Sequence, residues 1–129
     1  MKEFKGYVED IQDALILIEA SVNGYLDQKK ARLTFTEKMQ IRSGTTFILN
    51  ENDTNIKRWS DGISWTPSRL MDGFFVYQQQ STLPYDSHDA EIVKTDVDKH
   101  QVLHKKSIVI VAPNNHKFHL FNYYRPMDV

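Results

Sequence analysis

A chain of 129 residues that is 40% hydrophobic can bury one ordinary core, so a single domain is the expected organisation. The absence of cysteine excludes disulfide bonds and thiolate metal sites, and the sequence has no run of about 20 apolar residues that could cross a membrane. The net charge of -1 conceals a basic segment, because residues 29–69 carry eight lysines and arginines against four acidic residues. Such a segment indicates an anion-binding face, although a solvated helix face produces the same pattern.

The first part of the chain predicts a strand followed by two helices. Residues 4–8 are expected to form the strand, and Asp10 is expected to cap the first helix. Apolar residues then repeat at three- and four-residue spacing, with Ala14 and Leu17 beside them, so that one helix face belongs in the core: Ile11, Leu15, Ile18 and Val22. Asn23-Gly24 predicts the end of this helix. The pattern Thr34-x-x-Glu37 is a capping box and predicts a second, short helix.

The middle of the chain changes to an extended pattern. Residues 45–49 and 56–59 are rich in β-branched and apolar residues and flank a polar break, which predicts a hairpin. Ser60-Asp61-Gly62 is a tight-turn sequence. Thr66-Pro67 is typical of a helix start, so residues 68–71 are expected to form one helical turn.

The remaining segments complete one body. Residues 74–77 form a predicted strand that is too apolar to face water on both sides. Residues 81–101 have little apolar periodicity and predict a variable linker between two segments, 1–80 and 102–129. Beyond the linker, residues 107–111 and 117–124 predict a hairpin whose last strand can serve as a sheet edge. Because two strands alone are unstable in water, this hairpin must complete a sheet begun earlier, which gives an α+β fold: a strand-rich single globular body with short helices.

Residues 57–69 hold the densest group of candidate binding residues. The segment combines Lys57, Arg58 and Arg69 with two tryptophans, several hydroxyl side chains and a glycine turn. Cations can neutralise phosphates or enter a narrow minor groove, while hydroxyls and amides at a helix start can bind phosphate oxygens. The alternative is that Trp59 and Trp65 are core anchors and the cations only surround a turn.

Two shorter motifs could add to such a site. Arg42-Ser43-Gly44 can present a cation beside exposed amides at a helix end. Arg32-Leu33-Thr34 follows two lysines and resembles a site for a basophilic kinase. Phosphorylation of Thr34 would place negative charge beside the basic segment and should weaken binding to an anion.

Signals for catalysis, cofactors or metal binding are weak. His116-x-x-His119 has neither a cysteine nor a nearby carboxylate to complete a metal site, and both histidines are expected at the surface. The glycines are dispersed among turns, so no phosphate-cradling loop is present. The acidic run at residues 9–13 stands where a signal peptide would be apolar. We therefore expect a soluble intracellular protein that is not an enzyme and takes no cofactor, metal or small-molecule substrate.

Longer motifs follow one another along the chain in a distinctive order: Gly6-Tyr7, Asp13-Ala14-Leu15-Ile16-Leu17-Ile18-Glu19-Ala20, Ile41-Arg42-Ser43-Gly44, Arg58-Trp59-Ser60-Asp61-Gly62, Ser64-Trp65-Thr66-Pro67-Ser68-Arg69 and His119-Leu120-Phe121-Asn122-Tyr123-Tyr124. This series resembles the Gti1/Pac2 family, whose domain is also called the WOPR domain. The resemblance covers most of the chain outside residues 81–101.

The resemblance implies a fungal nuclear transcription regulator of morphology, cell-type switching or nutrient response. It also implies sequence-specific binding of double-stranded DNA at an A/T-rich site, with a basic loop inserted in the minor groove. Carried over residue by residue, the expected DNA contacts are Arg42, Ser43, Lys57, Arg58, Trp59, Ser64, Ser68 and Arg69. No half-site repeat or coiled-coil pattern is present, so a monomer is expected. The alternative function is a protein-interaction module that uses the exposed edge of the last strand or the tryptophan-rich loop.

Overall fold

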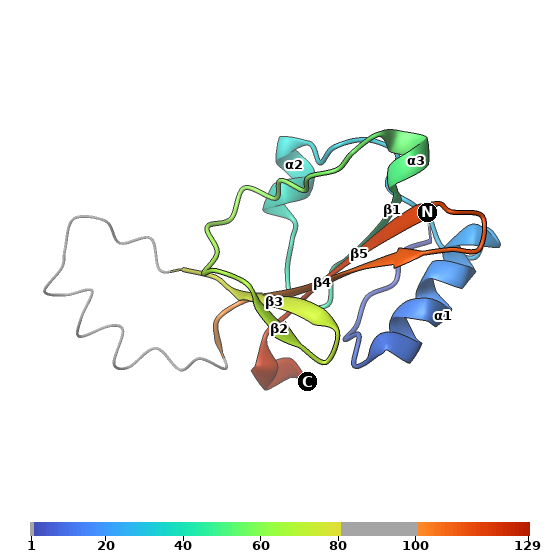
Figure 1. The fold of residues 1–129 in the computed structure, drawn as a ribbon. Helices are drawn as coiled ribbons and strands as arrows, with labels where there is room; N and C mark the ends of the chain where they lie inside the picture. Colours follow the sequence, from blue (N-terminus) through green and yellow to red (C-terminus); the bar gives the residue numbers. More distant parts are fainter. Residues whose placement is uncertain (1, 81–100) are drawn as a thin grey trace, which may run out of the picture.

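The computed structural model describes residues 2–80 and 101–129, so the predicted linker, residues 81–101, lies outside the described residues except for its last position. None of the described helices is long and apolar enough to cross a membrane. Figure 1 shows short helices around a twisted sheet. The elements in chain order are α1 (Ile11–Val22), α2 (Phe35–Met39), β1 (Thr46–Asn50), α3 (Glu51–Thr54), β2 (Arg69–Met71), β3 (Phe74–Gln78), β4 (His104–Val111), β5 (Lys117–Tyr124) and the 3-10 turn η2 (Pro126–Asp128).

The five strands form one antiparallel sheet in the order β1-β5-β4-β3-β2. The hairpin β4–β5 therefore fills the space between β1 and β3, and strands from both sequence segments build one sheet. This arrangement confirms the predicted α+β fold and the prediction that the C-terminal hairpin completes a sheet begun earlier. The predicted edge position of the last strand is wrong, because β5 has β1 on one side and β4 on the other.

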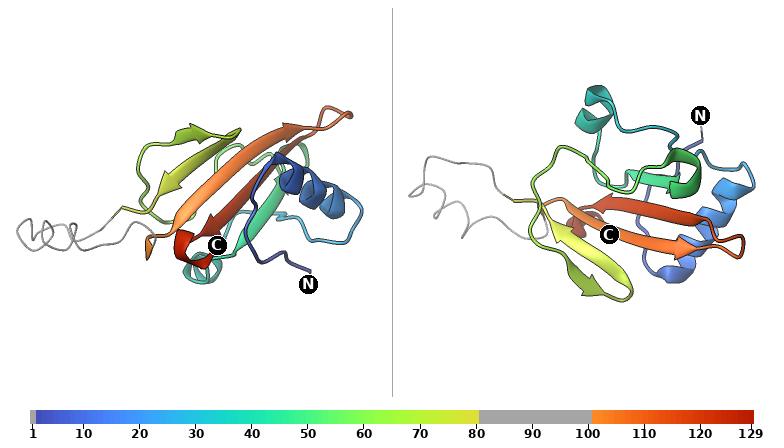
Figure 2. Two further views of the ribbon diagram at one scale, coloured as in Figure 1. Left: turned by 90° about the horizontal axis from the view of Figure 1, so that it is seen from below. Right: turned by 45° about the horizontal axis from the view of Figure 1, so that its top comes forward.

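The two faces of the sheet are covered differently, as the views in Figure 2 show. Helix α1 packs on one face, here called the helix face, where Ile48, Phe74 and Leu120 are buried. The segment after α3 crosses the other face, here called the loop face, where Leu49, Ile56, Phe121 and Tyr123 are buried. Side chains alternate between the faces along each strand. Lys105 and Lys106, adjacent in β4, consequently contact different cores.

Helix α1 begins at the predicted cap, because the Asp10 carboxylate accepts a hydrogen bond from the amide of Asp13 at 2.9 Å. The buried stripe is only partly the predicted one. Ala14, Ile18 and Ser21 are buried, whereas Ile11, Leu15 and Val22 are between 41% and 57% exposed. The small side chains of Ala14 and Ser21 allow the helix to approach the sheet closely, which turns the larger predicted residues outward.

Residues 4–8 do not form the predicted strand and make only an isolated bridge between Lys5 and Thr45. The backbone of this segment is bonded by side chains of β4 and β5 and not by the backbone of a neighbouring strand. The Asn122 side chain accepts from the amide of Val8 at 3.0 Å, and the Lys106 ammonium donates to the Val8 carbonyl at 2.7 Å. Lys106 also lies 4.3 Å from the centre of the Phe74 ring. Burial lowers the pKa of this lysine against the opposing effect of nearby acidic residues.

The predicted hairpin at residues 45–59 is also wrong. Strand β1 pairs with β5, and the polar break after it folds into α3. The Asn50 side chain caps α3 by accepting from the amides of Asn52 and Asp53. Asn55 ends it in the left-handed conformation with φ of 59°. The following residues, 56–59, do not form a strand.

Strand β2 occupies the place of the predicted helical turn. The Thr66 hydroxyl accepts a hydrogen bond from the amide of Gln78 at 3.0 Å and so ties the segment to β3 instead of capping a helix. Asp72 and Gly73 both have positive φ, as a two-residue hairpin turn of type I′ requires. Strand β3 confirms the prediction for residues 74–77, because Phe74 is fully buried while Phe75 is 48% exposed, so that the strand faces water on one side and the core on the other.

Candidate nucleic-acid interface

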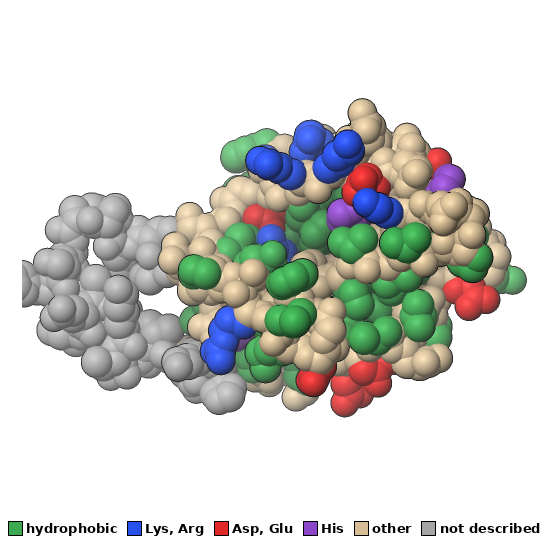
Figure 3. Space-filling view, in the orientation of Figure 1, with side chains coloured by type: hydrophobic (Ala, Val, Ile, Leu, Met, Phe, Trp, Pro, Cys, Tyr) green, Lys and Arg blue, Asp and Glu red, His purple; other side chains and the backbone are tan. Residues whose placement is uncertain are grey.

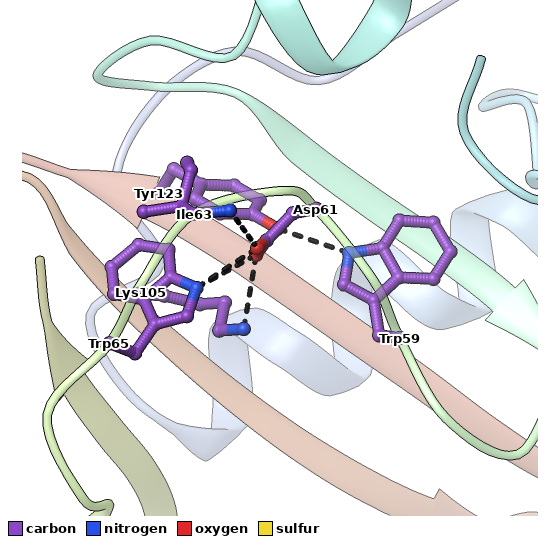
Figure 4. A network of polar contacts seen from close by, with 6 residues as sticks. All are labelled: Trp59, Asp61, Ile63, Trp65, Lys105 and Tyr123. Carbon is purple, nitrogen blue, oxygen red and sulfur yellow. Dashed lines mark hydrogen bonds and ion pairs between the residues drawn. The ribbon is translucent and has the colours of Figure 1, made fainter. Parts of the chain in front are cut away.

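The segment from Ser60 to Trp65 is fixed to the loop face by the buried carboxylate of Asp61. Figure 4 shows this carboxylate at the centre of contacts that come from β4, β5 and the segment itself. It accepts from the Tyr123 hydroxyl at 2.7 Å, from the Lys105 ammonium at 3.1 Å and from the Trp65 indole at 3.0 Å. The amide of Ile63 adds a fourth bond at 3.1 Å and closes the turn.

The ion pair between Asp61 and Lys105 is almost fully excluded from water, with side-chain exposures of 3% and 9%. Burial by itself would raise the pKa of Asp61, but the Trp65 hydrogen bond, the Lys105 charge and the Tyr123 hydroxyl outweigh it and hold that pKa below its ordinary value. Burial and the neighbouring Asp61 charge raise the pKa of Tyr123. Asp61 therefore stays charged and Tyr123 stays protonated near neutral pH.

Both tryptophans serve as anchors for this segment. Trp59 stacks on Phe121 with ring centres 4.7 Å apart, and its indole donates to the Tyr123 hydroxyl at 3.0 Å. Trp65 packs against Tyr123 and has the Lys105 ammonium 4.7 Å from its ring centre. Large aromatic side chains that are both packed and hydrogen-bonded hold a chain segment in one position. The packing interpretation of the two tryptophans is thus observed, and a DNA contact of Trp59 stays a prediction.

A basic cluster lies beside this anchored segment and consists of Arg32, Lys38 and Arg58, while Lys57, the neighbour of Arg58 in the chain, acts on the charge of Glu51. The Arg32 guanidinium donates to the carbonyl of Arg58 at 3.0 Å, and a side chain at Gly62 would meet the Lys38 side chain at 3.3 Å. Figure 3 shows cations gathered over α2 and the segment that follows α3. The sequence pattern pointed to Lys57 and Arg58 but not to Arg32 or Lys38, because those two approach the loop only in the folded chain.

The other predicted contacts lie at two further places. Ser64, Ser68 and Arg69 are exposed where the loop leads into β2. Arg42 and Ser43 precede β1 and do not form the predicted helix end, since α2 already ends at Met39. The Ser43 hydroxyl accepts from the amide of Arg125 at 2.9 Å, while Arg42 is exposed.

Thr34 confirms the predicted capping box of α2. Its hydroxyl accepts from the amide of Glu37 at 3.1 Å, and the Glu37 carboxylate accepts from the amide of Thr34 at 2.9 Å. Thr34 is exposed and lies two residues after Arg32 of the basic cluster. A phosphate on its hydroxyl would therefore lie close to that cluster.

Among residues 2–80 and 101–129, no group of three histidine, cysteine or acidic side chains is placed to hold a metal ion. The two histidines of the His-x-x-His sequence are half-buried and not at the surface as predicted, because each contacts a residue at the start of α3. His116 contacts the Asn50 side chain at 2.9 Å, and His119 contacts the Glu51 carboxylate at 2.8 Å. One ring nitrogen of each histidine, Nδ1 of His116 and Nε2 of His119, is therefore engaged in a structural contact.

Part of the chain is similar in sequence to fungal proteins that are named as regulators. Transcriptional regulator MIT1 of Saccharomyces cerevisiae is 42% identical over 77 residues, which are 59% of this chain and 12% of that protein. Global transcription regulator sge1 of Gibberella moniliformis is 43% identical over 77 residues, 59% of this chain and 24% of that protein. The cAMP-independent regulatory protein pac2 of Schizosaccharomyces pombe is 35% identical over 79 residues, 61% of this chain and 34% of that protein. The chain thus spans about a third or less of the length of these relatives.

Solved structures share the fold over nearly the whole chain. The WOPR domain of Wor1 from Candida albicans in complex with a 17-bp double-stranded DNA matches with a TM-score of 0.76 and 27% identity, covering 99% of this chain and 80% of that chain. Its complex with a 13-bp double-stranded DNA matches with a TM-score of 0.77 and 29% identity, covering 99% and 79%.

A model of the Gti1/Pac2 family matches residues 3–96, which is most of the chain. The named relatives are transcription regulators, in agreement with the prediction that the chain is not an enzyme. The family predicted from the order of the motifs is therefore confirmed, and this chain belongs to the Gti1/Pac2 family.

Proposed function

We propose that this chain is the DNA-binding domain of a fungal transcription regulator and that it binds double-stranded DNA sequence-specifically. The observation that carries the proposal is the likeness to the Wor1 WOPR domain in its complexes with double-stranded DNA, which extends over 99% of this chain. The basic cluster beside a fixed segment adds physical support, because phosphate binding needs cations that are exposed and held in place.

The proposed site is A/T-rich, and the basic loop enters its minor groove. A/T-rich tracts have a narrow minor groove with enhanced negative potential, which attracts an inserted arginine. Arg58 is the best candidate for this role because it is exposed and directly precedes the anchored Trp59. Trp59 borders the same groove in this proposal. The Asp61 contacts would keep Arg58 in position before DNA arrives, which reduces the ordering cost of binding.

The remaining predicted residues contact the phosphate backbone in this proposal. Lys57 and Arg69 supply charge, while Ser64 and Ser68 supply hydroxyl donors at the start of β2. Arg42 and Ser43 contact a more distant phosphate. Contacts of this kind fix the register of the protein on the duplex without reading bases. The domain acts as a monomer in the nucleus, and the regulator controls morphology, cell-type switching or nutrient response.

Thr34 is the proposed control point of this interface. Its hydroxyl is exposed at the start of α2, and Arg32 of the basic cluster precedes it by two residues. Phosphate at a helix N-terminus is electrostatically favourable, so phosphorylation need not unfold α2. The added negative charge would compete with DNA phosphates for the same cations, and DNA affinity would fall.

Selection from a random duplex library tests the proposed function. The wild-type chain should enrich an A/T-rich motif. The Arg58→Ala variant should lose that enrichment, whereas Arg125→Ala, which removes an exposed arginine paired with Asp128 near the C-terminus, should retain it. No enrichment by the wild-type chain at low salt would refute sequence-specific DNA binding. Enrichment of a G/C-rich motif would refute the proposed minor-groove mode.

A further inference from the structure

Four apolar side chains lie together on the loop face, across three neighbouring strands. Side chains alternate along β4, so Ser107, Val109 and Val111 all lie on this face. Phe75 pairs with Ser107, and Leu70 pairs with Phe75. Directly paired residues of neighbouring strands share a face of the sheet. Leu70, Phe75, Val109 and Val111 therefore form one surface, here called the apolar patch.

The residues of the apolar patch are between 48% and 69% exposed. The anchored segment lies beside them on the same face, where Trp59 stacks on Phe121 and Trp65 packs against Tyr123. Figure 3 shows hydrophobic side chains gathered over β2, β3 and the end of β4, with lysine and arginine side chains above them. Contiguous exposed apolar surface with a polar border is typical of a site where another macromolecule binds.

The apolar patch is a sheet surface of the kind that a helix covers. A sheet is normally buried by a second layer on each apolar face, and α1 is that layer on the helix face. The segment after α3 supplies the layer on the loop face above β1 and β5, where Ile56 and Trp59 pack, and leaves the apolar patch exposed. An amphipathic helix with apolar residues at three- and four-residue spacing would complete this layer.

The charges beside the apolar patch favour an acidic occupant. Lys117 is exposed and pairs with Val111, so its side chain starts from the same face. The hydrogen bond with His119 and the charges of Lys117 and Lys57 lower the pKa of Glu51, so both lysines lie near this carboxylate. Two exposed lysines beside one carboxylate leave positive charge at this border of the patch. Carboxylates of a partner would be attracted to it.

We infer that the apolar patch binds an amphipathic helix of a partner protein, with the apolar side of the helix on Phe75 and Val109 and with glutamate or aspartate facing Lys117. The nearby carboxylate of Asp72, in the turn between β2 and β3, lies toward the helix face, where its charge acts on Lys106. The apolar patch contains none of the predicted DNA contacts, so this binding goes beyond the proposed function.

The test uses a synthetic helical peptide with leucine on one side and glutamate on the other, and a matched peptide with lysine in place of glutamate. No DNA is present, so the outcome is independent of the proposed DNA binding. In titrations of the isotope-labelled chain, the glutamate peptide should shift the amide signals of Phe75 and Val109, and the lysine peptide should leave them unchanged. A Val109→Thr, Val111→Thr variant should bind the glutamate peptide about tenfold more weakly than a Val22→Thr, Val129→Thr variant, which makes the same change at exposed valines outside the patch.

Equal affinity of the two valine variants for the glutamate peptide would overturn the inference, since the helix would then bind elsewhere. Lys117→Glu should weaken binding of this peptide more than Lys5→Glu, which makes the same change in charge at an exposed residue of the N-terminal segment. Equal effects of these two changes would overturn the charge preference. Unchanged amide signals of Phe75 and Val109 in the wild-type chain would overturn the site without the use of any variant.

Discussion

The Tyr123→Phe variant isolates the contribution of one hydroxyl to the anchoring of the basic loop. This hydroxyl accepts from the Trp59 indole at 3.0 Å and donates to the Asp61 carboxylate at 2.7 Å. The substitution keeps the ring, so it creates no large cavity. It removes one hydrogen bond to a buried charge and leaves the indole donor without its protein partner, which together should cost about 2–4 kcal/mol. For a domain of this size the melting temperature should fall by roughly 10 °C.

Tyr124→Phe is the matched control for this prediction. Tyr124 is the next residue in β5, and its hydroxyl makes no hydrogen bond to the described part of the chain, although the ring packs on Tyr7. Urea denaturation of both variants and the wild-type chain gives the free energies of unfolding on one scale. A Tyr123→Phe variant that is no less stable than Tyr124→Phe would refute the argument that the Asp61 contacts anchor the loop.

Three further predictions concern pH, charge and modification. Because the pKa of Asp61 is lowered on folding, its carboxylate stabilises the fold above the unfolded pKa of about 3.9, and that contribution is lost as the pH falls further, through the lowered pKa of the folded chain. In urea denaturation, the difference in stability between wild type and Asp61→Asn should therefore narrow as the pH falls below about 4. Arg32→Ala should weaken binding of all duplexes by a similar few-fold factor in anisotropy titrations, whereas a change in sequence preference would contradict a phosphate contact. Thr34→Asp keeps a capping side chain and should weaken DNA binding several-fold. The control is Thr36→Asp, which adds the same charge at another exposed position of α2. An equal loss of DNA affinity in this control would argue against a special position for Thr34.

Signals that act over a few residues were sufficient to predict part of the fold. The Asp10 cap and the Thr34 capping box are made by side chains three residues from their partners, and both are observed. The β4–β5 hairpin was also predictable, because its apolar strands flank a turn-forming sequence. The requirement that two strands need a larger sheet then placed this hairpin in one body with the first segment.

Contacts between residues that are distant in the sequence account for the secondary-structure predictions that were wrong. Thr66-Pro67 carries a local helix signal, but the hydroxyl of Thr66 is bound to the amide of Gln78, and pairing with β3 makes a strand of the following residues. Residues 4–8 have strand propensity, yet Asn122 and Lys106 satisfy their backbone from more than 95 positions away. No local pattern contains such partners.

The anchor of the candidate site was missed for the same reason. Asp61 lies in a Ser-Asp-Gly sequence that is typical of an exposed turn, and Lys105 follows a polar segment. Their ion pair joins residues 44 positions apart and forms only when β4 enters the sheet. The order of the motifs was sufficient to identify the family, whereas the structure was needed to identify the residues that hold the loop in place.

The most direct test of the account is the salt dependence of DNA binding by the wild-type chain and Arg58→Ala. Fluorescence anisotropy of the selected A/T-rich duplex and a scrambled duplex would be measured over a range of salt concentrations. The account predicts that wild-type affinity for the selected duplex falls steeply with salt, and that Arg58→Ala lowers this slope by about one and loses most of the discrimination between the duplexes. Unchanged discrimination in Arg58→Ala would contradict the claim that the anchored basic loop reads DNA.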